Sequence, residues 1–417
     1  MRDPMTRNAP FLPLSPAMLA AAPHRLMFFT GASNVLLAML WWTAWLVDAR
    51  WGSLGLAEAP AYAGWMHAVL MQYLVLPPFM FGFLLTVFPR WMGLPELRRA
   101  HYLPVGAGLF GGQLLVLAGL AGSARVLLVI GLGLAIAGWA WGLVQLLRVL
   151  SAERRARKPV TWHAVSCWAA MLLGLVGLAL ALGFVLGAPL WTVFVAIKLG
   201  TFGLLLPVYL TVAHRMFPFF AGNVVAGYQP WRPLWLLPLM WMLVLAHLLL
   251  ELLHATSWTW LVDAPFALGA AFVLWRWWPR SRAPGLLWVL FAGFAWLPVA
   301  MALYAVQSAT QALAGETMLG RAPLHALSIG FFGSLLVAMV TRVTQGHSGQ
   351  ALAMPAAGWF AFALVQLAAL VRIVAETADD VLGWQVAAGM TWLLAFTPWV
   401  LRNLAIYLRP RSDGKPG

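Results

Sequence analysis

The sequence predicts an all-α polytopic membrane protein with about twelve transmembrane helices, and three observations lead to this fold class. Of the 417 residues, 63% are hydrophobic and only 9% are charged, whereas soluble globular proteins carry about 25% charged residues. The 25 tryptophans are typical of chains whose amphipathic rings lie at membrane interfaces. Apolar runs of about 20 residues, long enough to cross a bilayer, recur along the whole chain.

On this length criterion the chain contains twelve predicted spans, with their shortest joints at Gly122–Ser123 and around Thr256–Ser257. The chain shows no soluble domain, so we expect a single integral membrane domain over residues 1–417, with a short segment at 1–23 and a tail at 408–417. The predicted spans are 24–48, 62–89, 102–121, 124–148, 161–186, 190–214, 233–255, 258–278, 284–307, 321–344, 353–375 and 382–407.

Charge predicts the orientation of these spans. An even number places both termini on one side, and the loops on that side hold 21 of the 26 Lys and Arg residues. The opposite loops hold Arg50, Arg125, Arg321 and Arg372, while Lys198 lies within a span. This positive-inside bias predicts cytoplasmic termini. Because the arginines lie in short loops beside apolar spans, the net charge of +14 indicates topology and a lipid bilayer as partner, with no nucleic acid.

The ends and the single cysteine exclude further features. Cys167 is alone, which excludes an internal disulfide and a cysteine-based zinc or iron–sulfur cluster. The basic N-terminal segment, with Arg2, Arg7 and Arg25, precedes an apolar run that is too long for the core of a signal peptide. We therefore expect the first span to be retained.

Two histidines at equal predicted depth are candidate haem ligands. His67 and His325 each lie a few residues into a span that enters from the outer face. A b-type haem needs one imidazole on each side of the iron and apolar walls, and a histidine within a span is costly and usually functional. Small neighbours such as Gly330 would let a flat macrocycle approach, and Arg321 would pair a propionate. The alternative is that both are interfacial histidines, bonded to backbone or to each other.

A second candidate site lies on the seventh span. His247, Glu251 and His254 have the spacing i, i+4, i+7, which places them on one helical stripe. Two imidazoles and a carboxylate are ligands that copper, iron or zinc accept. The alternative is a solvated helix end, although Glu251 would need a partner inside hydrocarbon. Lys198, on the sixth span, needs a partner for the same reason. Its functional interpretation is proton or anion handling, and the alternative is a side chain that snorkels to the interface.

Two patches on the predicted cytoplasmic side combine histidine and arginine. One contains His214 in the stretch HRMFPFF (214–220), and the other contains Arg342 and His347 in TRVTQGHSG (341–349). A second haem, an anion or lipid phosphate could lie there, and lipid contact is the expected role of the arginines.

Four stretches together resemble the NnrS family of bacterial membrane proteins. These are LHALSIGFFGSLLVAMVTRVTQGHSGQAL (324–352), HRMFPFF (214–220), FGFLLTVFPRWMG (81–93) and LRPRSDGKPG (408–417). The resemblance implies a twelve-helix protein of the bacterial inner membrane that contains one or two haems and copper. It also implies a link to nitric oxide, in denitrification or nitrosative stress.

The match to the NnrS family has one departure. Where the family commonly has H-A-H-E-M, this chain has His67 followed by Ala68, Val69, Leu70 and Met71. A site built on the missing histidine and glutamate is therefore not expected. By the family pattern, His67, His325, Arg342 and His347 carry over as candidate cofactor residues.

The chain also resembles, more distantly, the catalytic subunit of haem–copper oxidases and nitric oxide reductases. That family resembles this chain in its twelve helices, its haem between histidines on helices 2 and 10, and its metal-site histidines on helix 7. Here the seventh span lacks a His-His pair and the tenth has one histidine, His325, where two are expected. These departures disfavour an oxygen-reducing, proton-pumping site.

Three functions follow from these residues. The first is a haem protein that handles nitric oxide, as a reductase-like oxidoreductase with copper or non-haem iron at the second site and a quinol or cytochrome as electron donor. The second is a binding or sensory protein that sequesters nitric oxide or metal without turnover. The third is a transporter, which the intramembrane charges favour and the absence of an inverted repeat disfavours.

Overall fold

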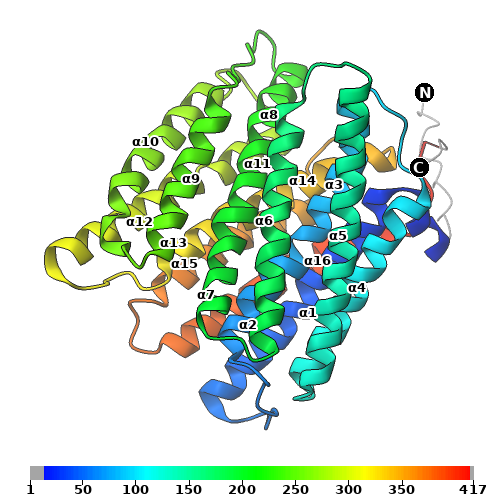
Figure 1. Cartoon of the computed structure of the whole chain (residues 1–417). Coiled ribbons are helices and arrows are strands. Elements are labelled where there is room, and N and C mark those ends of the chain that lie inside the picture. Colours follow the sequence, from blue (N-terminus) through cyan, green and yellow to red (C-terminus); the bar gives the residue numbers. More distant parts are fainter. Residues whose placement is uncertain (1–13, 414–417) are drawn as a thin grey trace, which may run out of the picture.

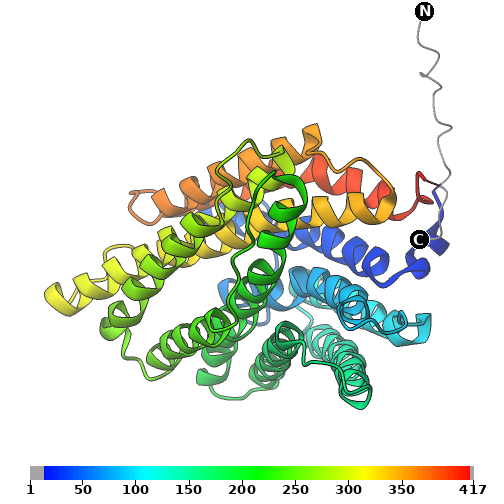
Figure 2. The same ribbon diagram turned by 90° about the horizontal axis from the view of Figure 1, so that it is seen from above.

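The structure, a computed structural model, describes residues 14–413, and the secondary structure in this range is helical. Its sixteen α segments form twelve continuous rods, because four rods contain two α segments each. Figures 1 and 2 show the rods lying side by side in one bundle. The single-segment rods are α1 (Pro23–Trp51), α4 (Arg99–Ala121), α5 (Arg125–Arg155), α6 (Trp162–Val185), α9 (Leu236–Leu252), α10 (Trp260–Trp277), α15 (Ala356–Val374) and α16 (Val381–Tyr407).

The four composite rods contain internal changes of helix type or direction. Three of them include a π-helical stretch between two α segments, and the fourth bends at Ala295. They are α2 (Ala63–Val69), η2 (Leu70–Val75) and α3 (Pro77–Trp91); α7 (Trp191–Lys198), η3 (Leu199–Leu205) and α8 (Leu206–Val224); α11 (Gly285–Phe294) and α12 (Trp296–Ala314); and α13 (Ala322–His325), η5 (Ala326–Gly333) and α14 (Ser334–Ser348). Two short 3-10 helices complete the described chain, η1 (Pro16–Ala21) and η4 (Thr256–Trp258).

The rods fall on the twelve predicted spans, and the all-α membrane fold is confirmed. Within residues 14–413, nine rods are long and apolar enough to cross a membrane. The other three are α9, which is apolar but has 17 residues, α10 and α16. Both short joints are real breaks, since Ser123 has a φ of 53° and η4 separates α9 from α10. The count of twelve membrane crossings itself stays a prediction.

Both ends of the described chain meet at one end of the bundle, which we call the termini end. The amide of Ser15 donates to the carbonyl oxygen of Leu408 at 2.8 Å. The guanidinium of Arg25 donates to the carbonyl oxygens of Tyr407 at 3.1 Å and Arg409 at 2.6 Å. This arrangement agrees with an even number of crossings. Residues of the 1–23 and 408–417 segments outside 14–413, including Arg2, Arg7 and Lys415, lie outside the described residues.

The three π-helical stretches follow three of the polar side chains that the sequence analysis places within spans. η2 begins three residues after His67, η3 begins directly after Lys198, and η5 begins directly after His325. A π-turn adds a residue and rotates the following helix, and such turns occur frequently at functional sites. Each π-helical stretch therefore sets the angle about the rod axis between a polar side chain and the apolar residues that follow it in the same rod.

The α4–α5 pair depends on glycine. A Cβ atom on Gly108 would lie 2.6 Å from the Cα atom of Gly138 and 2.9 Å from the carbonyl oxygen of Leu134. Backbone atoms cannot move away as a flexible side chain can, so the two helices approach closely only without side chains here. Small residues at such contacts are the usual basis of helix association in membranes.

We predict that Gly108→Leu destabilises the protein by about 1–3 kcal/mol or more, because overpacking against backbone forces the helices apart. The matched control is Gly133→Leu on α5, since a Cβ atom there meets no atom within 4 Å. The measurement is the Tm of the purified protein in detergent. Equal Tm values for the two variants would contradict the role assigned to the glycine contact.

Candidate functional site

His67 lies at the end of the bundle opposite the termini end, on α2. Its ring stacks on the indole of Trp42 from α1, with centroids 4.3 Å apart and an interplanar angle of 11°. The ring is partly exposed at the bundle surface, but its Nδ1 atom is buried without a hydrogen-bond partner. A buried nitrogen without a partner is costly, and a ligand would satisfy it.

His325, the predicted partner of His67, lies at the same end on α13. Its Nδ1 atom lies 2.9 Å from the carbonyl oxygen of Arg321. A carbonyl oxygen only accepts, so Nδ1 carries the proton and Nε2 keeps its lone pair. Metal-bound histidines typically have this tautomer, with the second nitrogen donating to a carbonyl or carboxylate. His67 lies within electrostatic range of His325, and their joint role as ligands stays a prediction.

Two arginines and one glutamate surround the histidine pair. The charges of Arg372 and Arg321 act on both rings. Arg372 is buried, with 7% of its surface exposed, and forms an ion pair with Glu376. Glu376 also accepts a hydrogen bond from the amide of Arg321 at 2.9 Å. We call these five residues the histidine–arginine cluster; its excess positive charge suits an anionic group.

The small residues expected to admit a macrocycle have another use in this structure. A Cβ atom on Gly330 would lie 2.4 Å from the indole of Trp296, whose Nε1 donates to Gln366 at 2.6 Å. The space beside Gly330 is therefore filled by tryptophan, contrary to the expectation for this residue. A flat ligand at the cluster would have to approach on the side of Trp42 and the bundle surface.

The residues of the predicted span-7 site lie in two environments. His247 is fully buried, and its Nδ1 lies 2.6 Å from Oδ1 of Asp263 on α10. Its Nε2 lies 3.5 Å from Oε1 of Glu251, and Glu251 forms an ion pair with Lys198 on α7. His254 instead stacks on Phe194 at 5.0 Å, beyond the end of α9.

The buried part of this site is a row of ionisable side chains, Asp263, His247, Glu251 and Lys198, which we call the α9 charge row. Because Asp263 accepts from Nδ1, the Nε2 atom of His247 is left for another partner, and it is buried without a hydrogen bond. Within residues 14–413, no three His, Cys, Asp or Glu side chains are arranged to hold one metal ion. The second-metal set, with His254, therefore stays a prediction.

At the termini end the candidate residues do not form one site. His214 donates from Nε2 to the carbonyl oxygen of Pro233 at 3.2 Å and accepts at Nδ1 from Nε2 of His163 at 2.8 Å. With both nitrogens engaged, His214 offers no lone pair to a metal. Arg342 lies over the ring of Phe220 at 3.9 Å, as a packed cation.

His347 has a different neighbour at this end. Its ring lies 4.3 Å from that of His24, centroid to centroid, and the peptide oxygen of His347 accepts from Arg411 at 3.0 Å. Nδ1 of His24 is buried without a partner.

Sequence reasoning missed several members of these clusters. In the sequence analysis, Arg372 lies in an outer loop and Asp263 has no assigned role. The signals that could have found them are their positions within apolar runs, and Glu376 one helical turn after Arg372. Trp42 and His24 carried no signal, since their importance depends on which helices lie next to them.

The fold resembles a solved structure, a cryo-EM structure of a haem–copper terminal oxidase dimer, with a TM-score of 0.58 and 12% sequence identity. The similarity covers 97% of this chain and 87% of that chain, and at this identity it shows the fold alone. No curated protein matches the sequence. The family described as NnrS protein matches residues 18–411. Since this is nearly the whole chain, the protein belongs to the NnrS family.

Proposed function

We propose that this protein is a haem-containing protein of the bacterial inner membrane that handles nitric oxide. Membership of the NnrS family and the fold shared with a haem–copper oxidase support a metal-containing membrane protein with this link. The observation that carries the proposal is the histidine pair. His67 and His325 lie in one cluster, and each has a ring nitrogen that no protein group uses.

The residues present fit a haem b bound between these two imidazoles. His325 is held in the ligating tautomer by the Arg321 carbonyl, and Trp42 fixes the plane of the His67 ring. Arg321 and Arg372 would pair the anionic propionates, since Glu376 neutralises only one of them. When bound, the haem would supply an iron centre that exchanges electrons and binds nitric oxide.

The α9 charge row supports a second metal, copper or non-haem iron, at His247 and Glu251. A ligating histidine whose other nitrogen donates to a carboxylate is the usual arrangement in metal sites, and His247 has this arrangement with Asp263. His254 would complete the set only by leaving Phe194. Reduction of two nitric oxide molecules to nitrous oxide and water takes two electrons and two protons, which a haem beside a second metal suits.

The orientation follows the positive-inside bias. The termini end, with His24, His214 and His347, faces the cytoplasm, and the histidine–arginine cluster faces outward. The electron donor in this proposal is a quinol or a cytochrome.

Transport is a weaker candidate. Lys198 and Glu251 neutralise each other, so neither is an unpaired charge waiting for a substrate. The main alternative is a sensor that binds nitric oxide without turnover.

We expect the dithionite-reduced protein to show a sharp haem α band, which His67→Ala and His325→Ala should each abolish because one axial ligand is lost. The control is His101→Ala, at the termini end, where the histidine only accepts from the amide of Arg98. Absorption spectra of the purified variants decide this. Retention of the band in both ligand variants would refute the pair.

Turnover separates the enzyme from the sensor. We expect the reduced protein with a quinol or an artificial donor to consume nitric oxide continuously, followed with a nitric oxide electrode, and both histidine variants to fall to background. A haem band that shifts on adding nitric oxide, without consumption beyond one equivalent, would establish the sensor instead.

Elemental analysis tests the second metal. We expect His247→Ala to lose the copper or non-haem iron, and Asp263→Asn to weaken metal affinity about 10–100-fold because the orienting acceptor is lost. The haem band should remain in both, and His101→Ala should keep the metal. If His247→Ala retained the metal at full occupancy, the α9 charge row would not be the metal site. His254→Ala tests the third ligand in the same way.

A further inference from the structure

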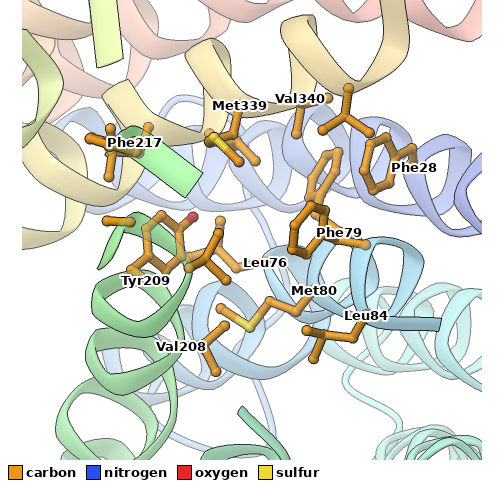
Figure 3. A pocket seen from close by; sticks show the side chains of 16 residues that line it. Phe28, Leu76, Phe79, Met80, Leu84, Val208, Tyr209, Phe217, Met339 and Val340 are labelled. Atoms are coloured by element: carbon orange, nitrogen blue, oxygen red, sulfur yellow. The ribbon is translucent and has the colours of Figure 1, made fainter. Parts of the chain in front are cut away.

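A cavity of about 80 Å³ lies among α1, α3, α8 and α14 (Figure 3). Its wall includes Leu76, nine residues after His67, and Leu335, ten residues after His325. At about 1.5 Å per residue, this places the cavity nearer the termini end by about 15 Å. It is therefore separate from the histidine–arginine cluster.

The cavity is apolar apart from one hydroxyl group. Of the 16 lining residues, only Tyr209 on α8 carries a polar side-chain atom. Figure 3 shows its oxygen directed toward the space between Met339 and Leu76, and this oxygen makes no hydrogen bond to the described chain. The rings of Phe28 and Phe79 pack nearby, tilted by 56° with their centroids 5.5 Å apart. This hydroxyl is the one side-chain group in the wall that can donate a hydrogen bond, so the site favours an apolar molecule that carries a hydrogen-bond acceptor.

A second polar group lies at the termini end of the same cavity. Phe28 and Val343 line the cavity, and His24 and His347 lie one helical turn away from them on the same two helices, toward the termini end. The rings of His24 and His347 pack at 4.3 Å. Nδ1 of His24 is without a partner although the residue is only 4% exposed. The cavity thus has an unused donor in its wall and an unused nitrogen beyond its end.

The cavity opens sideways rather than to water. Tyr209 and Val212 on α8 and Met339 and Val343 on α14 are only partly buried, and they lie in rods apolar enough to cross a membrane. A ligand that enters between these helices comes from the bilayer. The volume of the cavity is also several times the roughly 10–15 Å³ that one water needs, which leaves room for a ring.

We propose that this cavity binds the ring of a lipid-soluble quinone, with Tyr209 donating to one carbonyl oxygen and the His24–His347 pair serving the other. Aromatic side chains pack against the flat ring, and two carbonyl groups match the two polar positions. A plain acyl chain would leave both positions unused. The proposal concerns binding alone; its link to electron supply rests on the proposed function.

The test is equilibrium binding of tritiated ubiquinone-1 to the full chain in phosphatidylcholine nanodiscs, with empty nanodiscs subtracted. We expect saturable binding that Tyr209→Phe weakens about three- to tenfold, as the loss of one hydrogen bond predicts. Val340→Phe, which fills the cavity, should abolish it. His24→Leu should weaken binding and His24→Gln, which keeps a polar group, should restore most of it.

Two controls match these changes. Tyr62→Phe removes a hydroxyl from a residue that is 52% exposed, and Leu268→Phe adds bulk at a residue that is 73% exposed; both should bind as the unaltered protein does. Tyr209→Phe should fold normally, since the hydroxyl it removes has no protein partner. Absence of saturable binding, or binding unchanged in Tyr209→Phe and Val340→Phe, would overturn the proposal. Because oxidised ubiquinone-1 binds without haem chemistry, the haem α band reports separately on the proposed function.

Discussion

The pairing of polar side chains inside hydrocarbon is the constraint on which the rest of this structure depends. A charged group within a span has no water to solvate it, so it persists only beside a partner. In the α9 charge row, Asp263, His247, Glu251 and Lys198 lie beside one another across three rods. These contacts fix the rotation of α7, α9 and α10 together, since turning any one of these helices would leave a charge alone.

The π-helical stretches are the backbone counterpart of this constraint. In a regular α-helix the apolar stripe keeps the same face along the whole length of the helix. A polar residue on that stripe would therefore face hydrocarbon. The extra residue in η2, η3 and η5 shifts the stripe three residues after His67 and directly after Lys198 and His325. The half of each rod that carries the polar residue can thus face a cluster, while the other half packs in the apolar core.

The sequence was sufficient for properties that depend on one helix at a time. Span positions follow from apolar length, and the shared depth of His67 and His325 follows from span direction. Contacts between helices depend on how each helix is rotated about its own axis. The sequence of a helix that is apolar on all sides does not indicate this rotation. The partnership of His247 with Asp263, 16 residues later, and that of His24 with His347 were therefore out of reach. The same limit applies to His214, for which the sequence left a second haem, an anion or lipid phosphate open and whose two ring nitrogens are both engaged.

The departure at Val69 and Leu70 now has a physical account. Both residues are fully buried in the apolar core, at the boundary between α2 and η2. A histidine and a glutamate at these depths would need partners of their own, and apolar residues remove that need. The second rod therefore contributes one histidine, His67. The proposed second metal would take its ligands from another rod, and α9, with its partners α7 and α10, carries a buried histidine and carboxylates.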